Sequence, residues 1–128
     1  MALFPSNLLA SIETRCAQIL YRCMEEVGSS KGALYLKPRD EKDFFLVSHY
    51  GWPRGTRPPE LIGGKDPLTI IIQRQRRTFV ANDSDDFPEL RSFAQGAETP
   101  RFMVSPLYLM GDWVGVLIQM EKCKNVLF

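Results

Sequence analysis

The most restrictive feature of this chain is a pair of apolar runs within residues 101–122 that flank Gly111 and Asp112. Glycine adopts positive φ at little steric cost, so this pattern predicts a β-hairpin with a two-residue type II′ turn at Gly111 and Asp112. Both faces of the first strand are apolar, with Phe102, Val104 and Tyr108 on one face and Met103, Leu107 and Leu109 on the other. A strand with one face in water alternates apolar and polar residues instead. We therefore expect the hairpin in the middle of a sheet that is covered on both faces.

Length and charge limit the class of protein. A chain of 128 residues fits a single domain, taken as 1–128, that can bury a core without disulfide bonds. The 16 basic and 15 acidic residues give a net charge of +1, so neither a nucleic acid nor an anionic membrane is expected as a partner. No apolar run has the length of a membrane span, the N-terminus lacks a secretory signal, and the 3 cysteines argue against a disulfide framework. We expect a cytoplasmic protein.

Hydrophobic spacing and turn-forming residues predict the order of the other elements. Apolar residues recur at helical spacing over 7–27, in a stripe of Leu8, Ile12, Cys16, Ile19, Leu20, Cys23 and Val27. The elements that follow are strands over 32–37 and 43–50, a loop over 51–64, a helix capped by Asp66, a strand over 78–81, a turn over 82–86, a short helix over 87–94 and a loop over 95–100. Because the strands cluster in hairpins, they favour an α+β fold with an antiparallel sheet.

Three segments in this order resemble the corresponding parts of GAF domains, a family of small-molecule-sensing signalling modules. They are GALYL at 32–36 after the first helix, DPLTIIIQRQRRTFVAND at 66–83, and the closing hairpin at 102–120. The resemblance implies an α+β, GAF-like (profilin-like) fold. Its central antiparallel β-sheet would have helices packed on one face and loop or helix segments on the other. The resemblance also implies a regulatory sensor domain that binds a small molecule and signals through its terminal helices to an output domain or partner.

Residues that could carry catalysis or hold a metal form no recognisable pattern in the sequence. His49 is the only histidine, and no cysteines or histidines have metal-ligand spacing. The GGKD run at 63–66 fails as a phosphate-binding loop, because Pro59 and Asp66 stand where that motif needs glycine and serine or threonine. Methionine sulfoxide reductases of the GAF family carry cysteines on loops around the pocket, whereas loops 51–64 and 82–100 contain none. We therefore expect no enzymatic activity and no metal site, and the cofactor is unknown.

Aromatic residues in the two long loops indicate where a ligand would bind. Trp52 lies in the first loop, and Phe87 and Phe93 lie in the second. Large aromatic side chains over a buried sheet either close a pocket or fill it, and the sequence leaves both interpretations open. The expected lining of such a pocket comprises Tyr50, Trp52, Phe79, Asp83, Phe87, Phe93, Met103 and Ser105.

The sequence thus leaves two functions open. The first is a sensor domain with a small-molecule ligand, and the second is a GAF-fold dimerisation or scaffold module with a filled pocket and no ligand. In both cases we expect a homodimer through the first helix, because Leu9 and Met24 add apolar surface beside its core stripe.

Overall fold

The computed structural model describes residues 6–81 and 101–122. The elements in chain order are α1 (Ser6–Val27), β1 (Ser29–Leu36), β2 (Phe44–Tyr50), β3 (Leu61–Ile62), α2 (Pro67–Gln75), β4 (Phe79–Ala81), β5 (Phe102–Leu109) and β6 (Asp112–Lys122). Within the described ranges, every predicted helix and strand is present to within a few residues. The turn over 82–86, the helix over 87–94 and the loop over 95–100 lie outside the described residues.

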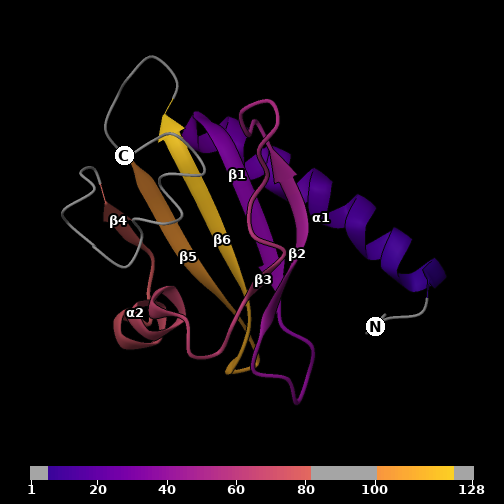
Figure 1. Cartoon of the computed structure of the whole chain (residues 1–128), viewed down its shortest axis with the longest axis vertical. Coiled ribbons are helices and arrows are strands. Elements are labelled where there is room, and N and C mark those ends of the chain that lie inside the picture. Colours follow the sequence, from indigo (N-terminus) through magenta and orange to yellow (C-terminus); the bar gives the residue numbers. More distant parts are fainter. Residues whose placement is uncertain (1–5, 82–100, 123–128) are drawn as a thin grey trace.

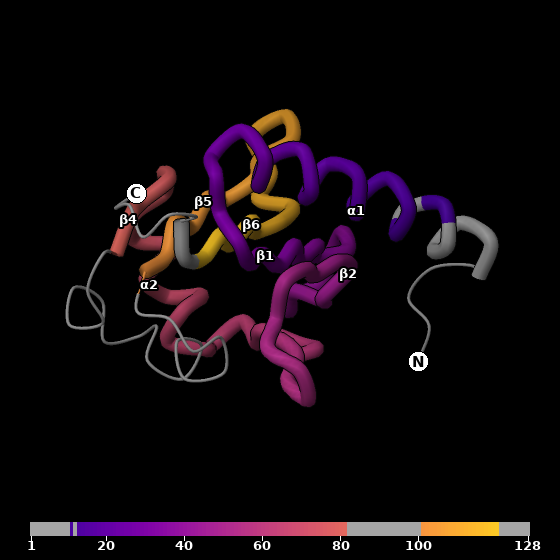
Figure 2. Tube along the Cα trace, turned by 90° about the horizontal axis from the view of Figure 1, so that it is seen from above, coloured from indigo at the N-terminus to yellow at the C-terminus, as the bar shows by residue number. Residues whose placement is uncertain are grey.

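The six strands form one sheet in the order β3-β2-β1-β6-β5-β4, in which all the neighbours run antiparallel (Figure 1). The closing hairpin of β5 and β6 therefore lies within the sheet, as the sequence predicted. Figure 2 shows α1 on one side of the sheet and α2 on the other. We call these two sides the α1 face and the α2 face. The arrangement confirms the predicted α+β fold with a central antiparallel sheet.

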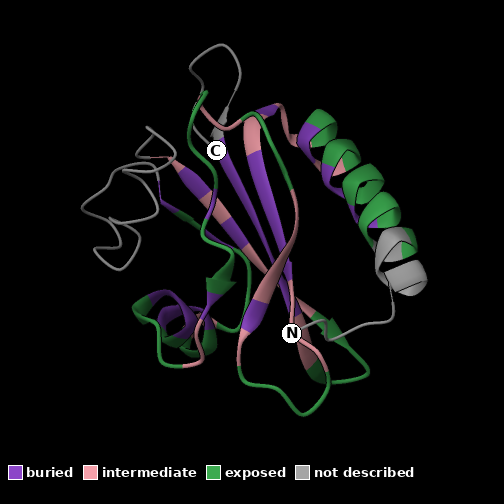
Figure 3. Ribbon diagram, turned by 45° about the vertical axis from the view of Figure 1, so that its right-hand side comes forward, coloured by how far each residue is buried: buried purple, intermediate pink, exposed green. Residues whose placement is uncertain are grey.

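Each face of the sheet has its own hydrophobic core. On the α2 face, Tyr35, Phe44 and Ile72 belong to a cluster that also contains Phe102 and Ile118. On the α1 face the buried cluster comprises Cys16, Leu20, Met24, Leu34 and Leu117. The strand β6 contributes to both clusters, and Figure 3 shows its middle as continuously buried. This explains why the sequence of β6 is apolar at consecutive positions.

The apolar stripe of α1 lies slightly off its predicted position. Ile19, which we placed in the stripe, is 54% exposed, whereas Met24, which we expected beside the stripe, is only 4% exposed. The buried positions Cys16, Leu20 and Met24 follow a four-residue step, so the contact with the sheet is centred on this row. Met24 is therefore a core residue and offers no surface for a partner. The side chain of Leu9 lies outside the described residues.

The hairpin turn differs from the predicted type. Leu109 pairs with Asp112, so the two central residues are Met110 and Gly111 rather than Gly111 and Asp112. Both have positive φ, 52° for Met110 and 87° for Gly111. Positive φ at both central positions defines a type I′ turn, in which asparagine or aspartate usually precedes glycine. Methionine at the first position is an unfavourable choice, and this side chain is also 96% exposed.

Replacing Met110 with asparagine is expected to stabilise the protein. Asparagine tolerates the left-handed conformation better than methionine, so the gain should be roughly 0.5–1 kcal/mol in the free energy of unfolding. Urea denaturation of both proteins measures this difference. A Leu109→Asn variant is the control, because it removes an exposed apolar side chain at a position outside the turn. If the two substitutions changed the free energy of unfolding equally, the turn conformation would not be the cause of the stabilisation.

Residues 51–64, predicted as a loop, contain the short strand β3 and are fastened to the sheet by side chains. The hydroxyl of Tyr35 donates to the carbonyl oxygen of Pro59 at 2.7 Å, and the indole N–H of Trp52 donates to the carbonyl oxygen of Gly32 at 3.2 Å. Burial raises the pKa of Tyr35 far above its usual range, so its hydroxyl remains a donor. Trp52 thus packs against the α2-face core as part of the fold.

The helix α2 begins as predicted. The carboxylate of Asp66 accepts a hydrogen bond from the backbone N–H of Leu68 at 2.9 Å, and Pro67 occupies the first helical position. The helix ends at Arg76, whose φ is 57° and whose backbone N–H donates to the carbonyl oxygen of Ile72. Across the described ranges, neither helix is long and apolar enough to pass through a bilayer.

Candidate functional site

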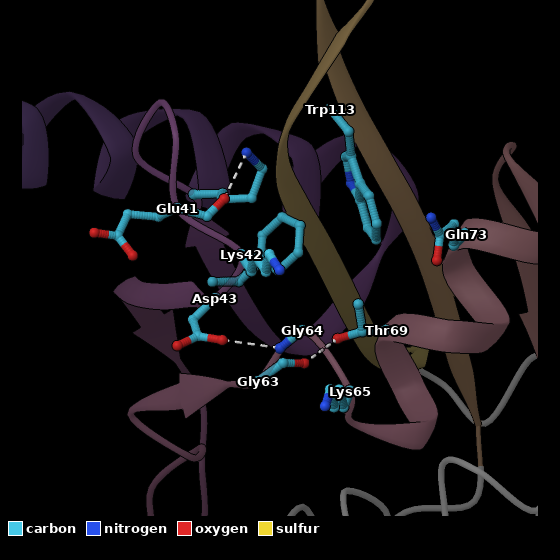
Figure 4. Close-up of a pocket in the computed structure, with 11 residues that line it drawn as sticks. Glu41, Lys42, Asp43, Gly63, Gly64, Lys65, Thr69, Gln73 and Trp113 are labelled. Carbon is cyan, nitrogen blue, oxygen red and sulfur yellow. Dashed lines mark hydrogen bonds between the residues drawn. The ribbon is translucent and has the colours of Figure 1, made fainter.

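A pocket of about 690 Å³ opens on the α2 face, where α2 approaches the turn between β1 and β2. It is lined by Lys37, Glu41, Lys42, Asp43, Phe44, Gly63, Gly64, Lys65, Thr69, Gln73 and Trp113 (Figure 4). The volume is within the range of small-molecule sites in proteins. Five of the eleven lining residues are charged, which makes this pocket more polar than most small-molecule sites.

One wall of the pocket joins the β1–β2 turn to the segment before α2. The backbone N–H of Gly64 donates to the carboxylate of Asp43 at 2.9 Å. A Cβ atom at position 64 would lie 2.9 Å from the carbonyl oxygen of Lys42, so the two segments approach closely only because residue 64 is glycine. This hydrogen bond also occupies the amide that a phosphate-binding loop would direct at an anion.

The opposite wall is formed by α2. Thr69 and Gln73 are four residues apart and so project from the same side of the helix. The hydroxyl of Thr69 donates to the carbonyl oxygen of Gly63 at 2.7 Å, which ties the first turn of α2 to the segment that precedes it. The amide of Gln73 remains exposed at the rim. The helix thus holds the Thr69 side chain in a fixed position and presents the Gln73 side chain to the pocket.

Trp113 on β6 reaches this pocket because of a β-bulge. Tyr108 pairs with Trp113 whereas Leu107 pairs with Gly115, so Val114 is an extra residue in β6. The bulge turns Trp113 toward the α2 face, where its ring lies 4.6 Å from that of Phe44 between centroids, at 48°. The indole N–H of Trp113 donates to the carbonyl oxygen of Gly115 at 2.9 Å. With its N–H engaged, Trp113 offers the pocket an apolar ring surface.

Two further hollows adjoin the same tryptophan. One, of about 400 Å³, lies between Trp113, Gln73, Arg76, Tyr108 and Gly111. The other, of about 780 Å³, extends from Trp113 along the two hairpin turns at this end of the sheet. Because Trp113 lines all three hollows, it is the side chain around which the concave surface of this region is organised.

The residues that the sequence proposed as a binding site do not lie together. Trp52 and Phe79, expected as pocket lining, pack into the core on the α2 face, and neither lines the pocket. The others that the structure describes, Tyr50, Met103 and Ser105, are on the α1 face, so their grouping with Trp52 and Phe79 is wrong. The ring of Tyr50 contacts that of Tyr21 in α1, and Ser105 pairs with Leu117 of the α1-face core.

The predicted lining took its β5 residues from the wrong face of the strand. Phe102 and Val104 belong to the α2-face core, so Met103, which lies between them, points to the opposite side. Side chains alternate strictly along the strand, as expected. Because the predicted face was the wrong one, both Met103 and Ser105 were placed on the side opposite to the one they occupy. Asp83, Phe87 and Phe93 lie outside the described residues.

The histidine and the buried cysteine of the described part of the chain lie away from the pocket. No three histidine, cysteine, aspartate or glutamate side chains there lie close enough to hold a metal ion. His49 is on β2, and partial desolvation together with the charge of Arg57 lowers its pKa. Cys16 is buried, and this burial raises the pKa of its thiol, which lowers its reactivity. Neither residue lines the pocket.

Comparisons with known proteins identify the fold. No family model and no curated protein matches this chain. Among solved structures, the GAF domain region of a putative membrane protein from Geobacter sulfurreducens PCA superposes with a TM-score of 0.68 at 15% identity, over 95% of this chain and 83% of that one. A GAF domain/HD domain protein from Geobacter sulfurreducens gives a TM-score of 0.64 at 17% identity, over 94% and 78%.

An enzyme shares the same architecture. The free methionine-R-sulfoxide reductase from Neisseria meningitidis, solved in complex with its substrate, gives a TM-score of 0.65 at 19% identity, over 90% of this chain and 67% of that one. The chain therefore has a GAF-like fold, as its sequence pattern indicated. Since GAF domains and a reductase both use this fold, the function has to be inferred from the site itself.

Proposed function

We propose that this chain is a regulatory sensor domain that binds a small molecule in the pocket beside Trp113. The observation that supports this most directly is the pocket itself. It joins the ring of Trp113, which packs on the buried ring of Phe44, to polar groups on α2 and on the β1–β2 turn. In this proposal the occupied pocket is signalled through α1, which packs on the other face of the same sheet, to an output domain or partner in the cytoplasm.

In this proposal the domain has no enzymatic activity of its own. The polar side chains of Thr69 and Asp43 each hold a backbone group of the opposite segment. Neither makes the nucleophile-to-base contact from which catalytic sites are built. Binding needs a pocket of suitable shape and charge, and the pocket beside Trp113 supports this part of the proposal.

A thermal-shift screen of metabolite-sized compounds of each charge tests the binding proposal. Compounds that bind the pocket should raise the melting temperature of the native protein and lose this effect in a Trp113→Ala variant. A Tyr50→Ala variant is the control, because Tyr50 is an exposed aromatic residue on the α1 face. Stabilisation that is lost in Tyr50→Ala and kept in Trp113→Ala would place the site on the wrong face and contradict the proposal.

The second candidate function is dimerisation or scaffolding without a ligand, and exposed apolar side chains on α1 favour it. Ile19 and Tyr21 are both at least half exposed although they flank the buried stripe of the helix. Figure 2 shows that α1 crosses the sheet obliquely, which leaves its outer surface uncovered by other described elements. Apolar surface of this kind is typical of contacts with another protein, here a second copy of the chain.

Substitution of Ile19 by glutamate is expected to dissociate the homodimer. A charge at the centre of an apolar contact must lose its hydration, which weakens association strongly. Light scattering coupled to size-exclusion chromatography measures the mass of both proteins at high concentration. Gln18→Glu adds the same charge at the neighbouring exposed position and should leave the dimer intact. A native protein that is monomeric at every concentration would remove the homodimer.

A further inference from the structure

The pocket beside Trp113 carries an excess of positive charge. The side chains of Lys37, Lys42 and Lys65 line it, and the ammonium of Lys37 donates to the backbone carbonyl of Glu41 at 3.0 Å. Lys42 and Lys65 make no ion pair or hydrogen bond through their ammonium groups with any other residue that the structure describes. Within the described ranges, two cationic groups at one pocket thus have no partner of opposite charge.

The acidic residues of the lining do not balance these cations. The carboxylate of Glu41 points away from Trp113 and Thr69 toward the outside of the pocket (Figure 4). Asp43 faces the pocket wall, where its carboxylate accepts the backbone N–H of Gly64. Among the described lining residues, only Asp43 brings negative charge to the interior, so these residues together present a positive field to a bound molecule.

The aromatic side of the pocket indicates the shape of the ligand. Trp113 and Phe44 pack together at a tilt, and the N–H of Trp113 is engaged by Gly115. Phe44 is only 1% exposed, so it supports Trp113 from behind, and Trp113 is the ring that offers surface to the pocket. Ring surface attracts flat apolar groups through stacking. Gln73 adds a side-chain amide at the rim, next to the tryptophan.

We propose that the ligand of this pocket is a planar organic anion, such as an aromatic carboxylate or phosphate ester. Its ring system lies against Trp113, and its anionic group is held by Lys42 and Lys65. This inference rests on the proposed sensor function and adds the charge and shape of the ligand. The backbone N–H of Gly64 plays no part in holding the anion, because it donates to Asp43.

Isothermal titration of the full chain with three matched probes tests this inference. The probes are 1-naphthoate, its neutral counterpart 1-naphthamide and the cation 1-naphthylmethylammonium, which share one ring system. Charged hydrogen bonds exceed neutral ones enough that naphthoate should bind roughly five-fold or more tightly than naphthamide. The cation should bind most weakly, and added salt should reduce the preference for naphthoate.

Substitution of the two lysines identifies the residues responsible. In a Lys42→Gln, Lys65→Gln double variant, the preference for naphthoate over naphthamide should fall to less than about two-fold, while binding of naphthamide is retained. An Arg54→Gln, Arg77→Gln double variant is the control for net charge, because both arginines are exposed and neither lines the pocket. A preference that persists in the double variant would overturn the inference.

The same titrations separate this inference from the proposed function. If naphthoate and naphthamide bound equally, or if naphthoate were the one probe that did not bind, the inference of a planar anion would be overturned. The pocket could then still bind other molecules, so the proposed function would stand. A neutral or cationic molecule that co-purifies with the chain, and whose binding is lost in Trp113→Ala, would also overturn the planar anion and leave the proposed function intact. The absence of any ligand of any charge would instead overturn the proposed function.

Discussion

Replacement of Gly51 by alanine is expected to lower the free energy of unfolding by about 3–5 kcal/mol. Gly51 follows β2 with a φ of 78°, which costs an alanine energy by itself. A Cβ atom at this position would also lie 2.0 Å from the backbone carbonyl oxygen of Ser30. Because a carbonyl in β1 cannot move without disturbing the sheet, the clash adds to the conformational cost. Urea or thermal denaturation measures the loss.

Gly55 provides a matched control in the same loop. Its φ is 82°, close to that of Gly51, but a Cβ atom there would meet nothing within 4 Å. Gly55→Ala should therefore cost only the conformational part, about 1–2 kcal/mol. The difference between the two variants isolates the close approach of Gly51 to β1. Equal losses for both variants would show that the loop does not pack against Ser30 as described.

Truncation of Ile72 to alanine is the second large effect, with an expected loss of about 2–5 kcal/mol in the free energy of unfolding. Ile72 lies on α2 and is completely buried in the α2-face core. Its removal takes away transfer free energy and leaves a cavity beneath the helix that forms one wall of the pocket. Chemical denaturation of the variant and of the native protein gives the difference directly.

Ile70 is the control for this substitution, since it is the same residue type on the same helix. It is 45% exposed, so Ile70→Ala should change the free energy of unfolding by less than about 0.5–1 kcal/mol. Alanine also has the higher helix propensity, which offsets part of any loss. If Ile70→Ala proved as destabilising as Ile72→Ala, the orientation of α2 on the sheet would be incorrect.

The elements of the fold could be predicted because their signals are local. The helical spacing of α1, the Asp66–Pro67 start of α2 and the apolar runs of the closing hairpin all report on neighbouring residues in the chain. The two-sided apolar pattern of the closing hairpin also placed it correctly inside the sheet. The turn type was missed because Met110 has a positive φ that its residue type does not suggest.

The candidate site could not be predicted because its signals are not local. Alternation along β5 separates Met103 from Phe102 but does not say which face holds α1. The bulge at Val114 reverses the direction expected for Trp113, so simple alternation from Gly115 would place this ring on the α1 face. The contact of Gly64 with Asp43 joins segments 21 positions apart, which no short pattern reveals.

Native mass spectrometry of the purified chain after incubation with a filtered metabolite extract tests the central claim most directly. We expect the native protein to retain a small molecule as a mass increment above the bare chain. Trp113→Ala should lose this increment, and Tyr50→Ala should keep it, because Trp113 lines the pocket and Tyr50 does not. The bare mass for all three proteins, or an increment retained by Trp113→Ala, would contradict a small-molecule site beside Trp113.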